Sequence, residues 1–458
     1  MSDAASADSY VCEILERVPE NKLSALAYFH RTPISLQMLD LLASRQDAKL
    51  RHLRFYELEP LWKAGVKLPT NLTALECRSV HEGEGMSRIL QANKNTLEVL
   101  SIGQERELIN HYRENRMRFL ELIPQPMDSF ASIACLSDLP RLRELRLCGL
   151  DVRRLIPSSM PEAMFFTNLE TLQLESCLGT AALLDTLAGT FHYAQNSPEA
   201  PQPRRVPQLK AFLFRHEAPT NILQASLIRV LASFTGLETL SLLFENATLL
   251  ERTSTHIGEH GSTLKTLVLE CRIQPRELLS LDTSRPFGVG GYSSELWEES
   301  INDICRLCPN LLELGMGFPW GDELVRFRQS PLPSLKCLRT IHIRNFPESQ
   351  ILSQLGDYTI KEFATKFVEW VYPAFKGGPQ PSLETVAVGP TLYQSRWKSN
   401  ATCKQPPEFL RTHFYCLDWH TTRFGRWGAV ITGVTEKCME EMREEKPLGG
   451  VFEPVWLK

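Results

Sequence analysis

One hydrophobic phrase recurs along the chain: a leucine, two variable residues, an apolar residue, one variable residue and a second apolar residue. Residues 142–147 (LRELRL) are a clear copy. The twelve copies begin at Leu23, Leu50, Leu72, Leu97, Leu142, Leu169, Leu209, Leu237, Leu264, Leu311, Leu338 and Leu383. Because side chains alternate between the two faces of a strand, the second half of each phrase predicts a short strand that is apolar on one face.

The spacing of the phrases predicts a repeat architecture. Seven of the eleven gaps between first residues fall in the window of about 20–29 positions that is typical of leucine-rich repeats. We therefore predict an α/β fold, a leucine-rich-repeat solenoid (horseshoe) with a parallel β-sheet on its concave face and helices and loops on its convex face. Residues 34–43, 180–187 and 222–234 have the helical apolar spacing that such return paths need.

The repeats divide the chain into an N-terminal cap, 1–22, an array, 23–390, and a C-terminal cap, 391–458. The array holds about 12 irregular repeats. Its longer gaps predict insertions: a charged helix near 104–122, polar loops near 195–208 and 282–294, and an amphipathic helix within 349–375. We expect the last segment to fold without repeats, because the end of a solenoid exposes an apolar layer that must be covered.

The composition of the chain limits the classes of partner and the cellular compartments that we expect. The chain has 458 residues and a net charge of −4, and its 50 Lys and Arg are outnumbered by 54 Asp and Glu. A nucleic-acid-binding protein usually has a basic excess, so we expect no nucleic acid partner. No apolar run reaches the ~18 residues of a membrane span, and the N-terminus lacks a signal-peptide pattern. We expect a cytoplasmic or nuclear protein whose 12 cysteines are reduced.

Catalytic motifs are weak in this sequence. Cys305 and Cys308 have the spacing of a redox pair or half a zinc site, but no second Cys or His pair stands at the distance a zinc site requires. Residues 288–291 (GVGG) open no helix with Lys-Ser/Thr, as a phosphate-binding loop would. We therefore expect no enzyme, no cofactor and no metal, and we keep a metal or redox enzyme using Cys305 and Cys308 as the least favoured alternative.

Several phrases carry a cysteine next to the repeat, as in Leu307-Cys308-Pro309-Asn310-Leu311 and Leu172-x-Leu174-x-x-Cys177. In this respect residues 20–390 resemble the irregular cysteine-containing leucine-rich repeats of fungal F-box proteins. The resemblance implies an array that holds a substrate, and an N-terminal F-box that binds a Skp-type adaptor of a ubiquitin ligase. Residues 11–29 lack the Leu-Pro-x-Glu opening of an F-box.

The predicted function is a non-enzymatic scaffold that binds a protein partner on its concave face; the alternative is the substrate-recognition subunit of an F-box-type ubiquitin ligase. Arg and Tyr are frequent interface anchors, and the variable positions of the strands supply them. The candidates for partner binding are Arg54, Tyr56, Glu76, Arg78, Arg146, Gln173, Glu175 and Arg215.

The same face continues in later repeats through Ser241, Glu270, His342 and Arg344. Small residues at some variable positions, such as Gly103 and the pair Gly315 and Gly317, leave room for a protruding element of a partner. A solvated sheet face with charge pairs between neighbouring strands is the other interpretation of this pattern.

Overall fold

A computed structural model describes residues 2–28, 30, 33–58, 65–79, 84–103, 139–157, 159–196, 206–217, 219–245, 253–272, 294–317, 331–344, 359–372, 380–389, 412–423, 425, 427–435 and 438. Everything below concerns these residues. They form two compact units, one made of residues 1–211 and 225–234 and the other of residues 212–224 and 235–458. The fold is α/β, with mostly parallel strands and connecting helices.

Every predicted strand is present, and each begins two residues after the first leucine of its phrase. The strands are β1 (Ala25–Tyr28), β2 (His52–Glu57), β3 (Ala74–Ser79), β4 (Val99–Gly103), β5 (Glu144–Cys148), β6 (Thr171–Glu175), β7 (Ala211–Glu217), β8 (Thr239–Glu245), β9 (Thr266–Arg272), β10 (Glu313–Met316), β11 (Thr340–Ile343) and β12 (Thr385–Val388). This confirms the assignment of the phrase to strands.

Helices connect many of these strands. They are α1 (Ser2–Arg17), α2 (Leu36–Arg45), α3 (Glu84–Ala92), α7 (Met160–Ala163), α8 (Thr180–Asn196), α9 (Asn221–Ala232), α10 (Thr253–Gly258), α11 (Ser294–Leu307) and α12 (Ile360–Val371), with short 3-10 turns at η2 (Val152–Leu155), η3 (Met164–Asn168) and η5 (Leu332–Ser334). Helices α2, α8 and α9 confirm the three predicted return helices, and α12 confirms the amphipathic helix expected within 349–375. The insertions near 104–122 and 282–293, and most of 195–208, lie outside the described residues.

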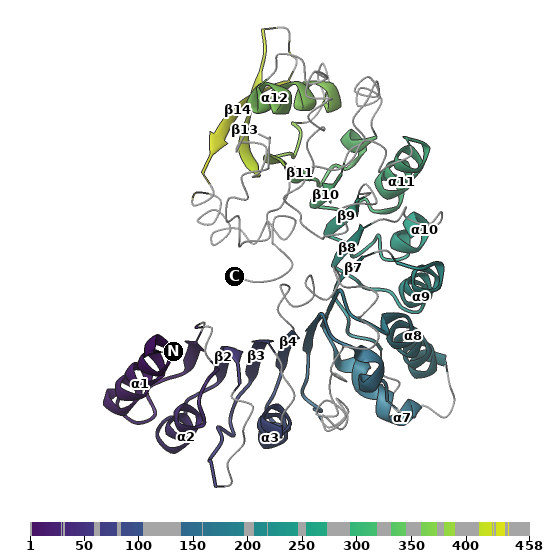
Figure 1. Ribbon diagram of the computed structural model, residues 1–458. Coiled ribbons are helices and arrows are strands. Elements are labelled where there is room, and N and C mark those ends of the chain that lie inside the picture. Colours follow the sequence, from purple (N-terminus) through teal and green to yellow (C-terminus); the bar gives the residue numbers. More distant parts are fainter. Residues whose placement is uncertain are drawn as a thin grey trace. The chain divides into compact units, whose positions relative to one another are not determined.

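In the first unit β1 to β6 pair in chain order, and all five pairings are parallel. The register of these pairings places one leucine of each strand beside a leucine of the neighbouring strand. The members from β2 to β6 are all buried: Leu53, Leu75, Leu100, Leu145 and Leu172. Helices α2 and α3 lie on one side of these strands (Figure 1). The leucine ladder is thus the core that joins one repeat to the next.

Buried polar side chains join the repeats as well. Three of them stand four residues before a phrase: Gln46, Asn93 and His260. Each accepts a hydrogen bond from the backbone N–H of the first leucine of the preceding phrase: Leu23 at 3.0 Å, Leu72 at 2.8 Å and Leu237 at 3.4 Å. A buried N–H without an acceptor costs about 1–3 kcal/mol, so these contacts stabilise the connections between repeats. The hydrophobic phrase alone did not indicate them.

In the second unit β8 to β12 follow the same parallel pattern. Beyond β12 the pattern changes, because β13 (His413–Thr421) pairs antiparallel with β12 and with β14 (Trp427–Val434). The indole N–H of Trp419 donates to the backbone oxygen of Leu383 at 2.7 Å and so fixes this hairpin to the start of β12. The described part of the C-terminal segment is therefore a hairpin and not another repeat.

Truncation of the leucine ladder should destabilise the protein. Leu145 is fully buried in β5 between Leu100 and Leu172, and a buried Leu→Ala change costs about 2–5 kcal/mol because a cavity remains. We expect Leu145→Ala to lower the urea midpoint of unfolding, followed by circular dichroism. Ile222→Ala is the matched control, since Ile222 is 70% exposed on α9. Equal midpoints for the two variants would contradict the role of the ladder.

Candidate functional site

The variable positions of the first strands form a partly exposed polar surface. In β2, His52 is exposed and Arg54 and Tyr56 are half-buried. The pairing of Arg54 with Glu76, of Glu76 with Ser101, and of Ser101 with Arg146 sets these four residues in one row across β2, β3, β4 and β5. Five of the eight predicted residues are partly exposed on β2, β3 and β5: Arg54, Tyr56, Glu76, Arg78 and Arg146.

Glu76 holds two arginines at once. The Nε of Arg54 donates to its Oε2 at 2.8 Å, and the Nε of Arg78 lies 3.5 Å from its Oε1. The side chain of Arg54 is 44% exposed, whereas that of Glu76 is only 16% exposed. The carboxylate thus lies deeper than the guanidinium that it orients, and the surface presents positive charge.

A third arginine, Arg146, is held by a carboxylate on β5. The Nη2 of Arg146 donates to Glu144 Oε2 at 2.9 Å, and the Arg146 side chain is 42% exposed. Between these two groups runs β4, where Ser101 and Gly103 are small and buried. We refer to the following residues as the arginine surface: Arg54, Tyr56, Glu76, Arg78, Glu144 and Arg146.

The other predicted residues are not part of an exposed surface. Gln173, Glu175 and Arg215 are at most 3% exposed, which differs from the expectation that they face a partner. The positions expected to continue the face in later repeats are buried too: Ser241, Glu270, His342 and Arg344. Alternation along a strand predicted which face these side chains occupy, but it does not reveal whether other parts of the chain cover that face.

The second unit contains a buried ion pair on this covered face. The Nε of Arg344 donates to Glu270 Oε2 at 2.7 Å, and both side chains are almost fully buried. Met316 on β10 stands beside Leu269 on β9 and Ile343 on β11. The next residue along the chain from each of these is Gly317, Glu270 and Arg344, respectively. Gly317 therefore stands between the two members of the ion pair. Because Gly317 has no side chain, Arg344 reaches across β10 to Glu270. The space above this glycine was expected to receive an element of a partner, but the chain's own Arg344 and Glu270 meet there.

His342 lies beside this pair on β11 and is also buried. Its Nε2 is 2.8 Å from the backbone oxygen of Gly389, just after β12. Leu243, Val268 and Ala387 form an apolar cluster on the same face, and Phe414 of β13 and Val434 of β14 pack against that cluster. The face therefore acts as a second core in this unit.

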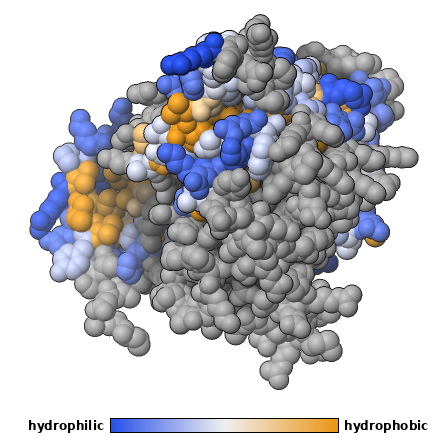
Figure 2. All heavy atoms as spheres, turned by 90° about the horizontal axis from the view of Figure 1, so that it is seen from above, coloured by the Kyte–Doolittle hydropathy of each residue, from blue (hydrophilic) through white to orange (hydrophobic). Residues whose placement is uncertain are grey.

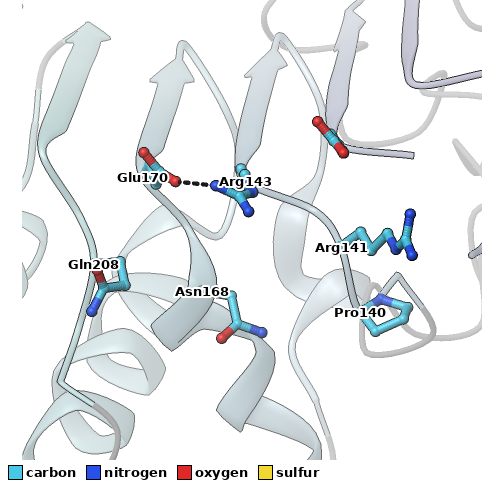
Figure 3. Close-up of a pocket in the computed structure, with 7 residues that line it drawn as sticks. Pro140, Arg141, Arg143, Asn168, Glu170 and Gln208 are labelled. Atoms are coloured by element: carbon cyan, nitrogen blue, oxygen red, sulfur yellow. Dashed lines mark hydrogen bonds and ion pairs between the residues drawn. The ribbon is translucent and has the colours of Figure 1, made fainter. Parts of the chain in front are cut away.

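A shallow pocket of about 560 Å³ lies where β4 to β6 begin. Its lining residues are Glu98, Pro140, Arg141, Arg143, Asn168, Glu170 and Gln208, and Figure 3 shows Arg143 paired with Glu170. Hydrogen bonds from Lys210 and Arg143 lower the pKa of Glu170. A similar ion pair lies at the starts of two other strands, where the Nζ of Lys265 is 2.5 Å from the Oε2 of Glu238. Exposed pairs of this kind stabilise by about 0–1 kcal/mol. We interpret the pocket as a space between ion pairs that stabilise the starts of neighbouring strands, and not as a binding site.

Three buried cysteines, Cys177, Cys305 and Cys308, do not have the environment of reactive thiols. Burial raises the pKa of Cys305 to about 12 and that of Cys308 to about 11. The thiolate is the nucleophile and the metal ligand, so a raised pKa disfavours both roles. Cys177 is similar, with burial raising its pKa to about 12. Among the residues described, no three His, Cys, Asp or Glu side chains gather as a metal site.

Comparisons with known proteins give no assignment. No protein-family model matches the chain, and no curated protein is significantly similar to it. Within the described ranges, none of the helices has the length and apolar character needed to cross a membrane.

Removal of one partner from the Glu270–Arg344 pair should be strongly destabilising. A single buried charge without its counter-ion costs about 3–5 kcal/mol, whereas removal of both charges costs much less. We expect Arg344→Met to lower the free energy of unfolding in urea more than the double variant Glu270→Gln and Arg344→Met does.

The matched control is Lys265→Met, which breaks the exposed pair with Glu238 and should change the free energy of unfolding by about 0–1 kcal/mol. Additive effects of the two buried substitutions would show that the pair is not coupled.

Proposed function

We propose that the chain is a leucine-rich-repeat solenoid that binds a protein partner through the arginine surface, without catalysis. The observation that carries this proposal is a contrast along one sheet face. The variable positions of β2, β3 and β5 are partly exposed and carry fixed arginines, whereas the same positions of β8 to β12 are buried. The accessible part of the face is therefore the part that carries interface-type residues.

The arrangement of the arginines favours binding over simple solvation. Arg54 and Arg146 are each held by a carboxylate on the sheet, so their guanidinium groups have little rotational freedom left to lose when a partner binds. An immobilised side chain otherwise costs about 0.5–1.5 kcal/mol on binding. Arginine is also among the residues that most often dominate interface energies.

A second surface supports the alternative function, recruitment of a ubiquitin ligase. Tyr10 and Ile14 are 64% and 58% exposed, and they stand one turn apart on α1. Figure 2 shows hydrophobic residues gathered at its left side, where the N-terminal elements lie. Exposed apolar side chains on one helix face are typical of protein docking. Residues 2–28 contain one helix followed directly by β1, whereas the F-box of the resembling family has three helices.

One capture experiment separates the two proposals. The tagged full chain is used to isolate partners from a lysate of its own source, in three forms: wild type, Arg54→Glu with Arg146→Glu, and Tyr10→Ser with Ile14→Ser. We expect the arginine reversal to abolish capture of the main partner, because reversed charge leaves the partner's groups unpaired across the interface. The α1 variant should keep that partner.

Arg229→Glu provides the control for a general charge effect, since Arg229 is 52% exposed on α9 and pairs with Asp185 at 2.6 Å. Loss of capture only in the α1 variant, together with a Skp-type adaptor among the wild-type partners, would favour the ligase role and contradict the arginine surface. Equal capture by all forms would contradict both proposals.

A further inference from the structure

One buried polar position recurs in the turn before three of the strands, and it is occupied by Gln46, Asn93 and His260. Each of these residues stands four positions before the first leucine of a phrase. The backbone oxygen of each accepts hydrogen bonds from the N–H groups three and four residues further along the chain, at 2.8–3.0 Å. The three turns therefore have the same backbone hydrogen bonds, and their central side chains can be compared directly.

The two amide side chains use both of their polar groups in this position. Gln46 and Asn93 accept the N–H of the first leucine of the preceding phrase through the amide oxygen. Their amide nitrogens donate to the backbone oxygens of Pro19 at 3.1 Å and of Pro69 at 2.8 Å. An amide keeps its acceptor and its donors whatever the pH, so these two connections do not titrate.

His260 makes the same contact with a ring that titrates. Its Nδ1 accepts a hydrogen bond from the backbone N–H of Leu237, with 3.4 Å between the two nitrogens. A neutral imidazole accepts through one nitrogen and donates through the other, much as an amide does, whereas both nitrogens of the protonated ring are donors. The contact with Leu237 therefore requires the neutral ring, because a proton on Nδ1 would point at the N–H of Leu237.

Helix α11 packs closely against this turn. A Cβ on Gly258 would lie 2.5 Å from the Cδ1 of Leu307, at the end of α11, and a Cβ on Gly261 would lie 1.8 Å from the backbone oxygen of Leu307. The residues on either side of His260 are thus in direct contact with the next helix, and His260 itself is 0% exposed. A proton on the ring would place a charge in the interior of the second unit, which costs free energy.

The elements packed around His260 are α10, α11 and the starts of β8 and β9. Their described charged side chains lie in ion pairs: His256 with Glu259, Glu238 with Lys265, and Asp303 with Arg306. Burial raises the pKa of Cys305 to about 12 and that of Cys308 to about 11, so both thiols stay neutral in mildly acidic solution. His256 is the other histidine of this segment, and it provides a control.

We propose that His260 makes the connection between the repeats of β8 and β9 sensitive to pH. Protonation removes the acceptor for Leu237 and adds a buried charge, so it favours opening of the turn. A histidine in the unfolded chain takes up its proton at about pH 6.5. The stability that depends on His260 is therefore complete above about pH 7.5 and is lost as the pH falls below about 6.5, because the unfolded chain then binds a proton that the folded turn excludes. This inference does not depend on the identity of a partner.

The test compares the wild-type chain with His260→Asn, which places the side chain of Asn93 in the same turn. Urea unfolding gives the equilibrium constant of unfolding at about pH 7.5 and about pH 5.5. Between these values the constant should rise about tenfold more for the wild type than for His260→Asn, since one ordinary histidine is protonated on unfolding. His256→Asn should keep at least the rise of the wild type. An equal rise in the wild type and His260→Asn would overturn the inference.

Hydrogen exchange provides a local measurement that needs no variant. The amide of Leu237 reports on the turn of His260, and the amide of Leu72, which is bonded to Asn93, is the internal reference. The protection factor of Leu72 divided by that of Leu237 should rise about tenfold from about pH 7.5 to about pH 5.5. A ratio that does not change with pH would overturn the inference, even where His260→Asn fails to fold.

Discussion

The parallel stacking of one buried leucine on the next is the constraint on which the rest of the structure depends. In each strand the inward position must be apolar and in register with its neighbour, as in Leu100, Leu145 and Leu172. Because side chains alternate between the two faces of a strand, the same requirement determines which residues lie on the opposite face, but it does not determine their chemical type. The outward positions are therefore available for function, or for a second core.

The protein uses that freedom in two different ways. In the first unit the outward residues of β2, β3 and β5 remain partly exposed, and recessed glutamates hold their arginines. In the second unit the same face is buried, and charge there is neutralised within the chain by Glu270 and Arg344 across Gly317. An ion pair in a dry interior must be complete, whereas a partly exposed arginine is also in contact with solvent.

The phrase predicted all twelve strands from β1 to β12 because a buried inward position leaves a strict signal, apolar residues with period two. The return helices α2, α8 and α9 were predicted for the same reason with a period of 3.6. Burial of Gln173, Glu175 and Arg215 was not predicted, because the pattern of one strand carries no information about distant segments. Gly317, which stands at the level of Glu270 on β9 and of Arg344 just after β11, is the signal that would have suggested an ion pair across β10.

The candidate site was predicted in part. Arg54, Arg78 and Arg146 were chosen for residue type, and the structure adds what orients them: Glu76 bridges two of them and Glu144 holds the third. The position of Ser101 between Glu76 and Arg146 follows only from strand register. Pairing across strands that are more than 20 residues apart in the chain is a property of the fold, so the sequence pattern alone does not contain it.

Photo-crosslinking tests the central claim most directly. A photoreactive phenylalanine is placed at His52, which is exposed beside the arginine surface, or at Ile222, which is exposed on α9, and the full chain is irradiated in a lysate of its source. Binding through the arginine surface predicts a crosslinked partner from position 52 that disappears with Arg54→Glu and Arg146→Glu, and none from position 222. A partner that crosslinks only from position 222 would contradict the account.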